Sequence, residues 1–280
     1  MDTRIQEPLA ERVLARLGFS HKPATDRAGL ATFYAAWCRS VPFDNTRKLI
    51  HVRSNDPAPL PGDSPADLLE GWLACGAGGT CWAMHGALTA ILEACGFDAR
   101  RGIGTMLVAP HLPPNHGTTS VRLDGKVYLV DGCIQHGEPL PLEAAFETAV
   151  EHPAYGVRAR PECDKWIVRW RSPFAPDGFD CRIDTLASDV DAFHEYHEQT
   201  RNWSPFNFEL FARVHRRGGV VGVARGERLD FDASGAIVRT PLDRDARLRF
   251  LVEELGLSEA FAHSVPDDQP MPPPPRGTGS

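Results

Sequence analysis

The sequence GGTCWAMHGALTAILEACG, residues 78–96, marks the point at which the chain changes from one kind of structure to another. Its apolar residues follow a helical spacing, with Met84 and Leu88 on one stripe. The two glycines at its start allow a tight turn, and Gly96 stands where a left-handed helix cap is expected. We therefore predict a helix over Cys81–Cys95, after which the helical pattern stops.

Helical patterns precede this segment and strand patterns follow it. Apolar residues recur at helical spacing in three earlier stretches, namely 9–17, 30–37 and 64–72. The segments after Gly96 that are rich in β-branched and aromatic residues are 99–109, 118–123 and 126–131. Further strand candidates are 166–171, the stretch near Ile183, 220–224, 227–231 and 237–239, and further helix candidates are 189–199 and a stretch from Asp243.

This order predicts an α+β protein and differs from the alternating pattern of a doubly wound sheet. We expect a helical region over residues 1–96, a β-barrel or curved sheet over 97–200 and a smaller α/β lid over 201–262. From Val265 onward the chain holds six prolines together with glycine and serine, so residues 263–280 are predicted to be a disordered tail.

Composition excludes several classes of function. The 280 residues carry a net charge of −7, which argues against a protein that binds nucleic acid or an anionic membrane. No apolar run approaches the ~18 residues that cross a bilayer. The polar, acidic N-terminus is unlike a secretory signal, so we expect a cytoplasmic protein whose seven cysteines are reduced thiols.

Cys81 is a candidate nucleophile because it follows two glycines and begins a helix. The N-terminus of a helix is the positive end of its dipole, so it favours a thiolate over a thiol. Free backbone N–H groups in the first turn are also suited to holding an oxyanion. The alternative is that Cys81 is one of several buried core cysteines, which is common for this residue type.

A second motif lies downstream, where Asp124-Gly125 separates two apolar runs and predicts a two-residue hairpin. In that register Asp131 lies opposite Thr118, and His116 points to the same face two residues further along. Such diagonal neighbours are within reach of a side-chain hydrogen bond. Asp131 would then orient His116 and stabilise its imidazolium, as acyl transfer requires. The alternative is a solvated histidine in a proline-rich loop and an aspartate that merely ends a strand.

With these residues in place, the sequence resembles the arylamine N-acetyltransferase family over roughly residues 5–260. The segments that carry the resemblance are Leu14–Phe19 with Val41–Asn45, Gly78–Cys81, and the stretch from His116 to Gly132. Gly78–Cys81 is similar to the family's Arg-Gly-Gly-x-Cys motif, and the last stretch is similar to the one that joins its catalytic histidine and aspartate.

The resemblance implies a helical bundle, a β-barrel and an α/β lid around a triad like that of cysteine proteases. It also implies a ping-pong reaction in which Cys81 accepts an acyl group from acetyl-CoA or another thioester and passes it to an amine. His116 is the expected base and Asp131 its orienter, with no tightly bound cofactor. The candidate pocket residues, which simple core packing would explain equally well, are Phe43, Ile134 and Phe206.

The sequence also departs from the family. Ala77 stands where the family has an arginine, and Ala83 and His85 replace its usual glutamate and asparagine. The residues after Asp131 differ as well. We therefore expect a divergent member whose donor or acceptor has changed, with biosynthetic amide formation and an acyl carrier protein as the donor among the hypotheses.

Two other classes use the same residues. A cysteine hydrolase or transglutaminase-like amidase would let water resolve the acyl-enzyme, and the choice depends on how dry the pocket is. A binding protein without catalysis is the third reading, because a fold alone does not determine function.

No metal site is expected. Cys75, Cys81 and His85 lack the paired Cys-x-x-Cys spacing of a structural zinc site. His194 and His197 share a predicted helix face with neighbouring glutamates, which is typical of a solvated surface. The expected partners are a small-molecule amine and an acyl thioester, with neither nucleic acid nor membrane.

Overall fold

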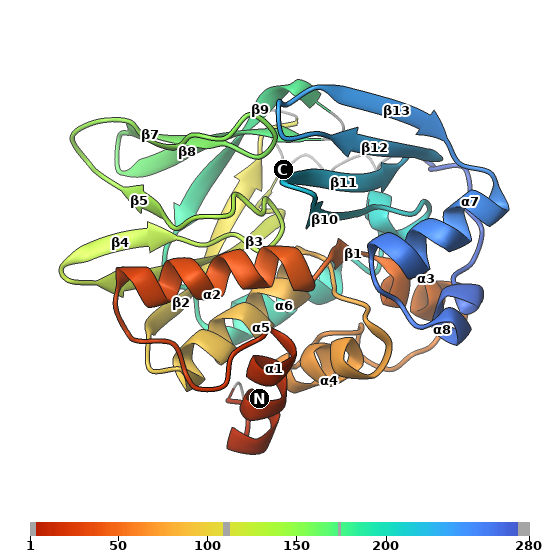
Figure 1. The fold of residues 1–280 in the computed structure, drawn as a ribbon, viewed down its shortest axis with the longest axis horizontal. Helices are drawn as coiled ribbons and strands as arrows, with labels where there is room; N and C mark the ends of the chain where they lie inside the picture. The colour runs from red at the N-terminus through yellow and green to blue at the C-terminus, as the bar shows by residue number, and fades with distance from the viewer. Residues whose placement is uncertain (1–3, 109–112, 173–174, 274–280) are drawn as a thin grey trace, which may run out of the picture.

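The computed structural model describes residues 4–108, 113–172 and 175–273. Figure 1 shows a curved sheet, β2–β9, beside a second sheet, β10–β13, with the red and orange N-terminal helices along their lower side. This arrangement confirms the predicted α+β fold of helical bundle, barrel and lid. Within the described part of the chain, no helix is long and apolar enough to cross a membrane.

The N-terminal bundle ends at the helix that carries Cys81. Its helices are α1 (Glu7–Arg16), α2 (Arg27–Ser40), α3 (Thr46–Arg53), α4 (Pro65–Cys75) and α5 (Cys81–Ala94). The side chain of Asp26 caps α2, and that of Ser64 caps α4, by accepting a backbone N–H in the first turn. Gly96, with φ +94°, follows α5 as predicted.

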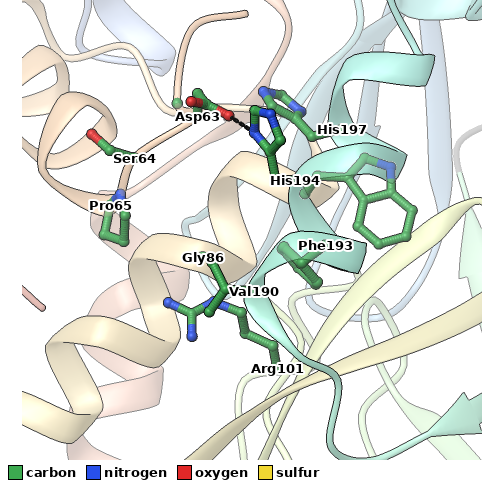
Figure 2. A pocket seen from close by; sticks show the side chains of 11 residues that line it. Asp63, Ser64, Pro65, Gly86, Arg101, Val190, Phe193, His194 and His197 are labelled. Carbon is green, nitrogen blue, oxygen red and sulfur yellow. Dashed lines mark hydrogen bonds and ion pairs between the residues drawn. The ribbon is translucent and has the colours of Figure 1, made fainter. Parts of the chain in front are cut away.

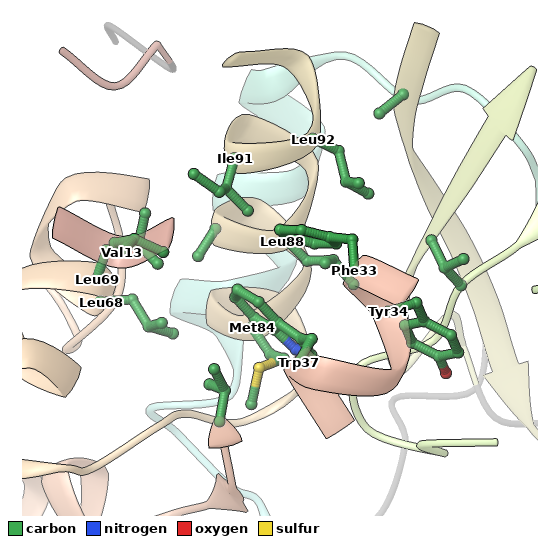
Figure 3. Close-up of a cluster of buried hydrophobic side chains, with 14 of the residues drawn as sticks. Val13, Phe33, Tyr34, Trp37, Leu68, Leu69, Met84, Leu88, Ile91 and Leu92 are labelled. Atoms are coloured by element: carbon green, nitrogen blue, oxygen red, sulfur yellow. The ribbon is translucent and has the colours of Figure 1, made fainter. Parts of the chain in front are cut away.

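Helix α5 lies at the centre of the largest hydrophobic core. Its residues from Cys81 to Leu92 are all buried, and most of them are apolar, as expected for a helix in the core of a protein. Figure 3 shows it between side chains of two neighbouring parts of the bundle, Val13, Leu68 and Leu69 on one side and Phe33, Tyr34 and Trp37 on the other. Burial of large side chains around α5 fixes the position of its first residue, Cys81.

The second part is an antiparallel sheet that curls into a nearly closed barrel. Its strands are β2 (Asp98–Met106), β3 (His116–Leu123), β4 (Lys126–Leu129), β5 (Leu140–Leu142), β6 (Thr148–Val150), β7 (Val157–Glu162), β8 (Lys165–Ser172) and β9 (Ala175–Thr185). They lie in the order β5-β4-β3-β2-β9-β8-β7-β6, and the end strands β5 and β6 approach each other. Leu123 pairs with Lys126, which confirms the predicted hairpin. Helix α6 (Val190–Gln199) follows the barrel.

The lid contains a second antiparallel sheet, in the order β1-β10-β11-β12-β13. Its elements are a 3₁₀ turn (Pro205–Asn207), β10 (Ala212–Arg216), β11 (Gly219–Ala224), β12 (Glu227–Phe231), β13 (Ile237–Pro241), α7 (Arg244–Arg249), a π-helical turn (Phe250–Glu254) and α8 (Glu259–Ser264). Its edge strand β1 (Phe43–Asp44) comes from the N-terminal part of the chain. The lid sheet is therefore joined directly to the segment between α2 and α3.

Several elements differ from the sequence prediction. The strands β1, β5, β6, β7 and β10 were not predicted. Two or three residues are too few to show alternation in β1, β5 and β6, whereas β7 and β10 do alternate apolar and basic residues and were missed. Strand β2 ends at Met106, and position 109 of the predicted strand lies outside the described residues.

The C-terminal segment also differs from the prediction as far as the structure describes it. We predicted disorder from residue 263, but Asp268 accepts a hydrogen bond from the backbone N–H of Leu210, 2.9 Å away. The side chain of Arg247 contacts both Asp267 and Asp268. Charge pairing thus holds this proline-rich segment against the lid, while residues 274–280 lie outside the described part.

Candidate active site

Cys81 is the first residue of α5, at the end of a turn that only glycine can form. A Cβ atom on Gly78 would lie 1.8 Å from the carbonyl oxygen of Pro42, and one on Gly79 would lie 2.8 Å from Leu68. The Cys81 sulfur is 3.8 Å from the carbonyl oxygen of Asn115, just before β3. Close backbone packing therefore brings the start of α5 against the start of β3.

Asp44 holds this turn in place through hydrogen bonds. One of its oxygens accepts the backbone N–H of Gly78 at 2.7 Å, and the other accepts the N–H and hydroxyl of Thr46. Burial raises the pKa of the Asp44 carboxyl, and these hydrogen bonds oppose the rise. The Pro-Phe-Asp-Asn segment thus has a clear structural role in holding the loop that precedes Cys81.

Asn45 attaches the lid to the same place. Its side-chain N–H groups donate to the carbonyl oxygens of Phe206 and Glu209 at 2.8 and 2.7 Å. Its carbonyl oxygen accepts the backbone N–H of Phe211 at 2.9 Å. Asp44 and Asn45 together connect the nucleophile loop to the lid.

His116 and Asp131 lie together as predicted. His116 is the first residue of β3, and Asp131 comes two residues after the end of β4. His116 Nε2 donates to Asp131 Oδ2 at 2.7 Å, and the Thr118 hydroxyl donates to the same oxygen at 2.7 Å. Both triad candidates are buried, with His116 2% exposed and Asp131 fully enclosed.

The second oxygen of Asp131 also has several donors. The backbone N–H groups of Cys133 and Ile134 donate to Oδ1 at 2.9 and 2.8 Å. Burial alone would raise the pKa of Asp131, but the neighbouring histidines hold it well below its usual range. Asp131 is therefore an ionised carboxylate at neutral pH.

The third donor to Oδ1 is His85, whose role the sequence did not predict. His85 Nε2 lies 3.2 Å from Asp131 Oδ1, and its Nδ1 lies 2.8 Å from the hydroxyl of Thr119. Burial lowers the pKa of His85, so the ring is neutral, donates to Asp131 and accepts from Thr119. The signal was present in the sequence, because residues four apart on a helix share a face and His85 follows Cys81 by four.

Tyr34 fixes the turn that contains Asp131. Its hydroxyl donates to the carbonyl oxygen of Asp131 at 2.6 Å and accepts the backbone N–H of His136 at 3.2 Å. His136 in turn donates from Nδ1 to the carbonyl oxygen of Glu138, and burial lowers the pKa of His136 to about 4. The bundle helix α2 therefore helps to place a residue of the barrel.

His116 connects the carboxylate with the sulfur. Burial by itself lowers the pKa of His116, but the charge and hydrogen bond of Asp131 and a side-chain hydrogen bond with Cys81 raise it to about 10. His116 therefore keeps its proton at neutral pH. A cationic imidazole beside the sulfur is the partner that a thiolate requires.

The predicted pocket residues do not all lie together. The rings of Phe43 and Phe206 meet edge to face with their centroids 5.5 Å apart, and Phe206 similarly meets Phe211. Ile134 instead packs in the barrel core, while its backbone N–H holds Asp131. The structure thus groups an aromatic wall beside the nucleophile loop and places Ile134 in a different environment.

Lys48 is a second residue that the sequence did not indicate. It is buried in α3 and donates to the hydroxyl of Thr200 at 2.7 Å. Burial lowers the pKa of Lys48 to about 7, although Cys81 and Glu198 act to raise it. Strongly perturbed groups of this kind are frequent near functional sites.

A metal ion does not fit the one cluster of potential ligands found among the described residues, which consists of His85, Asp131 and Cys133. Both oxygens of Asp131 already accept hydrogen bonds, and His85 uses both ring nitrogens. Burial raises the pKa of Cys133 well above its usual value, so its thiol keeps its proton. The donors of this cluster are therefore committed to the hydrogen-bond network.

A small pocket lies on another side of α5, between α5 and α6 (Figure 2). In this view Asp63 and His194 form a hydrogen bond, and Arg101 approaches Gly86 from below. None of the three triad candidates lines the pocket. It is therefore a feature separate from the candidate active site.

Comparison with known proteins identifies the family. The sequence model of a family described as N-acetyltransferase matches residues 26–173. An arylamine N-acetyltransferase of Mycolicibacterium smegmatis is 30% identical over 153 residues, which are 51% of this chain and 53% of that protein. The chain thus spans about half the length of the curated relative that it matches.

Solved structures resemble nearly the whole chain. Arylamine N-acetyltransferase from Salmonella typhimurium superposes with a TM-score of 0.76 at 20% identity, covering 93% of this chain and 98% of that one. The Mycobacterium marinum enzyme in complex with CoA superposes with a TM-score of 0.74 at 17% identity, covering 90% and 96%. At these identities the likeness shows a shared fold.

Proposed function

Because this chain belongs to the arylamine N-acetyltransferase family, we propose that it is an acyltransferase that carries an acyl group on Cys81 from a thioester to an amine. The observation that supports the proposal most strongly is the position of His116. One ring nitrogen donates to the ionised Asp131 at 2.7 Å, and Asp131 and Cys81 together raise the pKa of the ring. This arrangement contains a nucleophile, a proton carrier and an orienting carboxylate.

In the first half of the reaction the Cys81 thiolate attacks the carbonyl carbon of the thioester. The negative charge that develops on the carbonyl oxygen is stabilised by backbone N–H groups at the start of α5. When the carbon–sulfur bond of the donor breaks, His116 gives its proton to the departing thiolate. The products are a free thiol and an acyl group on Cys81.

In the second half an amine attacks the acyl group on Cys81. His116, now neutral, takes a proton from the amine nitrogen as the new carbon–nitrogen bond forms. The bond to sulfur then breaks, which releases the amide and restores the thiolate beside the imidazolium. Asp131 keeps the ring oriented through both halves.

Acyl-CoA is the donor that we propose, since a relative of the same fold was solved in complex with CoA. An acyl carrier protein, the other donor that the sequence suggested, gains no support from the comparisons. The aromatic wall of Phe43 and Phe206 suits an apolar acyl chain or an aromatic amine. A cytosolic location suits the seven free cysteines, which stay reduced there.

Intact-mass spectrometry tests the proposal directly. Incubation with acetyl-CoA is expected to add one acetyl group to the protein, and peptide mapping should place it on Cys81. Cys81→Ser should acquire none, whereas Cys163→Ser, which removes an exposed cysteine of the turn between β7 and β8, serves as the control. Failure of acetyl-, propionyl- and longer acyl-CoA to modify Cys81 would contradict the proposal.

The same preparation separates transfer from the two other readings. Addition of an arylamine should remove the acyl group and form an amide in amounts that match the protein. Loss of the acyl group at the same rate without amine would identify a hydrolase. Slow, unselective alkylation of Cys81 by iodoacetamide at neutral pH would instead favour a binding protein without catalysis.

A further inference from the structure

Arg213 lies on the face of the lid sheet that looks toward the barrel. Along β10, Ala212 and Val214 pack into the core formed with α7 and α8, so Arg213 points to the opposite face. Its guanidinium lies over the ring of Trp170 in β8, 5.3 Å from the ring centroid. Arg213 therefore sits between the lid and the barrel and is only 4% exposed.

This position is next to the candidate active site. Arg213 is the cross-strand partner of Phe43, and such partners project side by side from the same face of a sheet. Phe43 in turn bridges to Gly79, two residues before Cys81. The charge of Arg213 also acts on Cys133 in the turn after Asp131.

Arg213 has no anionic partner among the residues that the structure describes. Its Nε and Nη1 atoms are buried and donate a hydrogen bond to no described residue. Arg228, on strand β12 of the same sheet, instead contacts both Asp230 and Glu254. The carboxylate of Asp131, which acts on Arg213 electrostatically, already accepts five hydrogen bonds.

Contact with Trp170 does not satisfy these donors. A cation over an aromatic face uses the flat surface of the guanidinium, whereas its N–H groups point outward in the plane. Burial lowers the pKa of Arg213 to about 10, so the group is still charged at neutral pH. An unpaired buried charge is unfavourable, and its presence beside a reaction centre calls for a ligand that compensates it.

We propose that Arg213 binds a carboxylate group carried by one of the molecules that react at Cys81. Each of the two unpaired donors, Nε and Nη1, is suited to a charge-assisted hydrogen bond with a carboxylate oxygen. The carboxylate belongs either to the acyl group or to the amine. In either case the ligand has an apolar part next to an anion, which matches Phe43 and Arg213 side by side. This inference rests on the proposed acyl transfer and adds the charge of the substrate to it.

The first experiment compares matched substrates in the full-length protein. Succinyl-CoA and butyryl-CoA differ by a carboxylate on the acyl group, and para-aminobenzoate and para-aminobenzamide differ by one on the amine. We expect kcat/KM to favour the anionic member in one of the two pairs, and Arg213→Gln to lower that preference about tenfold or more. Arg160→Gln, which removes an exposed, ion-paired arginine of β7, should keep the wild-type preference.

A second measurement does not depend on turnover. Benzoate and succinate at millimolar concentration should raise the melting temperature of the wild type, whereas benzamide and succinamide should not. Arg213→Gln should lose this response, and Arg213→Lys should retain part of it because lysine keeps the positive charge but lacks the planar guanidinium. In the absence of any anion, Arg213→Met should melt no lower than the wild type, since it removes an unpaired buried charge.

The outcomes separate this proposal from the proposed function. If acetyl-CoA acylates Cys81 but neither substrate pair shows a preference that depends on Arg213, the carboxylate site is overturned and acyl transfer stands. If no thioester acylates Cys81, acyl transfer fails, and the melting temperatures alone decide whether Arg213 binds a carboxylate. A clear loss of stability in Arg213→Met would also count against the site, because it would show that Arg213 stabilises the fold without a ligand.

Discussion

The two oxygens of Asp131 face two histidines whose surroundings differ. On one side His116 donates at 2.7 Å, and Asp131 and Cys81 raise its pKa to about 10. On the other side His85 donates at 3.2 Å from the middle of a buried helix, and burial lowers its pKa. One carboxylate thus holds one imidazole as a cation and the other as a neutral ring, because only His116 has a second partner that favours its charge.

This difference suggests that the histidine on one side of Asp131 takes part in the reaction, whereas the histidine on the other side positions the carboxylate. His116 is placed to exchange a proton with the reacting groups, whereas His85 has no contact with the sulfur. His85 nevertheless lies on α5, the helix that begins at Cys81. Its hydrogen bond therefore ties Asp131 to the helix that carries the nucleophile, so that α5 positions two of the three triad candidates.

Replacing the shared carboxylate should have the largest effect. Asp131→Asn keeps the shape of the side chain but loses the charge that stabilises the His116 imidazolium. Its amide NH₂ group also replaces an oxygen that accepts hydrogen bonds, so those donors lose their acceptor. We expect acylation of Cys81 to slow by about 10³- to 10⁴-fold. Rapid-mix mass spectrometry with acetyl-CoA measures that rate. Asp124→Asn, in the exposed hairpin turn where asparagine is equally suited to positive φ, is the matched control and should keep the wild-type rate.

The His116 side can be tested through the pH dependence of stability. The pKa of His116 is about 10 in the folded protein and lies near the ordinary value of 6.5 in the unfolded chain. Its stabilising contribution is therefore complete below about pH 6.5 and is lost as the pH rises through about 10. Urea unfolding of the wild type and His116→Gln should differ by a few kcal/mol near pH 6 and by much less above about pH 10. A difference that stays constant across this range would show that His116 is not held as a cation.

The His85 side should show a smaller effect of a different kind. His85→Leu removes a hydrogen bond to a charged acceptor, worth about 1.5–3 kcal/mol, so kcat should fall about 10- to 100-fold while KM changes little. Loss of the donor also raises the pKa of Asp131, so the acid limb of the rate profile should move to higher pH. His85→Gln supplies an N–H at the position of Nε2 and should recover most of the rate. Equal losses in both variants would indicate a purely structural residue.

The parts of this site that could be predicted depend on local rules. Asp124-Gly125 determines a hairpin register, and that register places His116 and Asp131 on one face without any knowledge of the rest of the molecule. The two glycines before Cys81 are also local, since the turn leaves no room for a Cβ at Gly78. The triad therefore follows from short-range geometry together with the recognised family motif.

The parts that could not be predicted depend on contacts between distant segments. Phe43 pairs with Arg213, which lies 170 residues later in the chain, and no pattern in either segment predicts that pairing. His85 carried a weak signal, because it follows Cys81 by one helical turn, but its partner Thr119 lies on a strand whose depth in the core the sequence does not reveal. Burial changes the pKa and the hydrogen-bond partners of a residue such as His85, and the burial of each residue depends on the whole fold.

The smallest expected effect on kcat comes from two neighbouring threonines of β3, one with a charged hydrogen-bond acceptor and one with a neutral acceptor. The Thr118 hydroxyl donates to the Asp131 carboxylate, whereas the Thr119 hydroxyl donates to the neutral ring of His85 and so reaches Asp131 at one remove. A neutral hydrogen bond contributes about 0.5–1.5 kcal/mol, so Thr119→Val should lower kcat by roughly two- to tenfold, and Thr118→Val should lower it more. Both variants keep the branched shape, and parallel kcat measurements compare them directly. The reverse order would mean that the His85 side, and not the His116 side, governs how Asp131 is oriented.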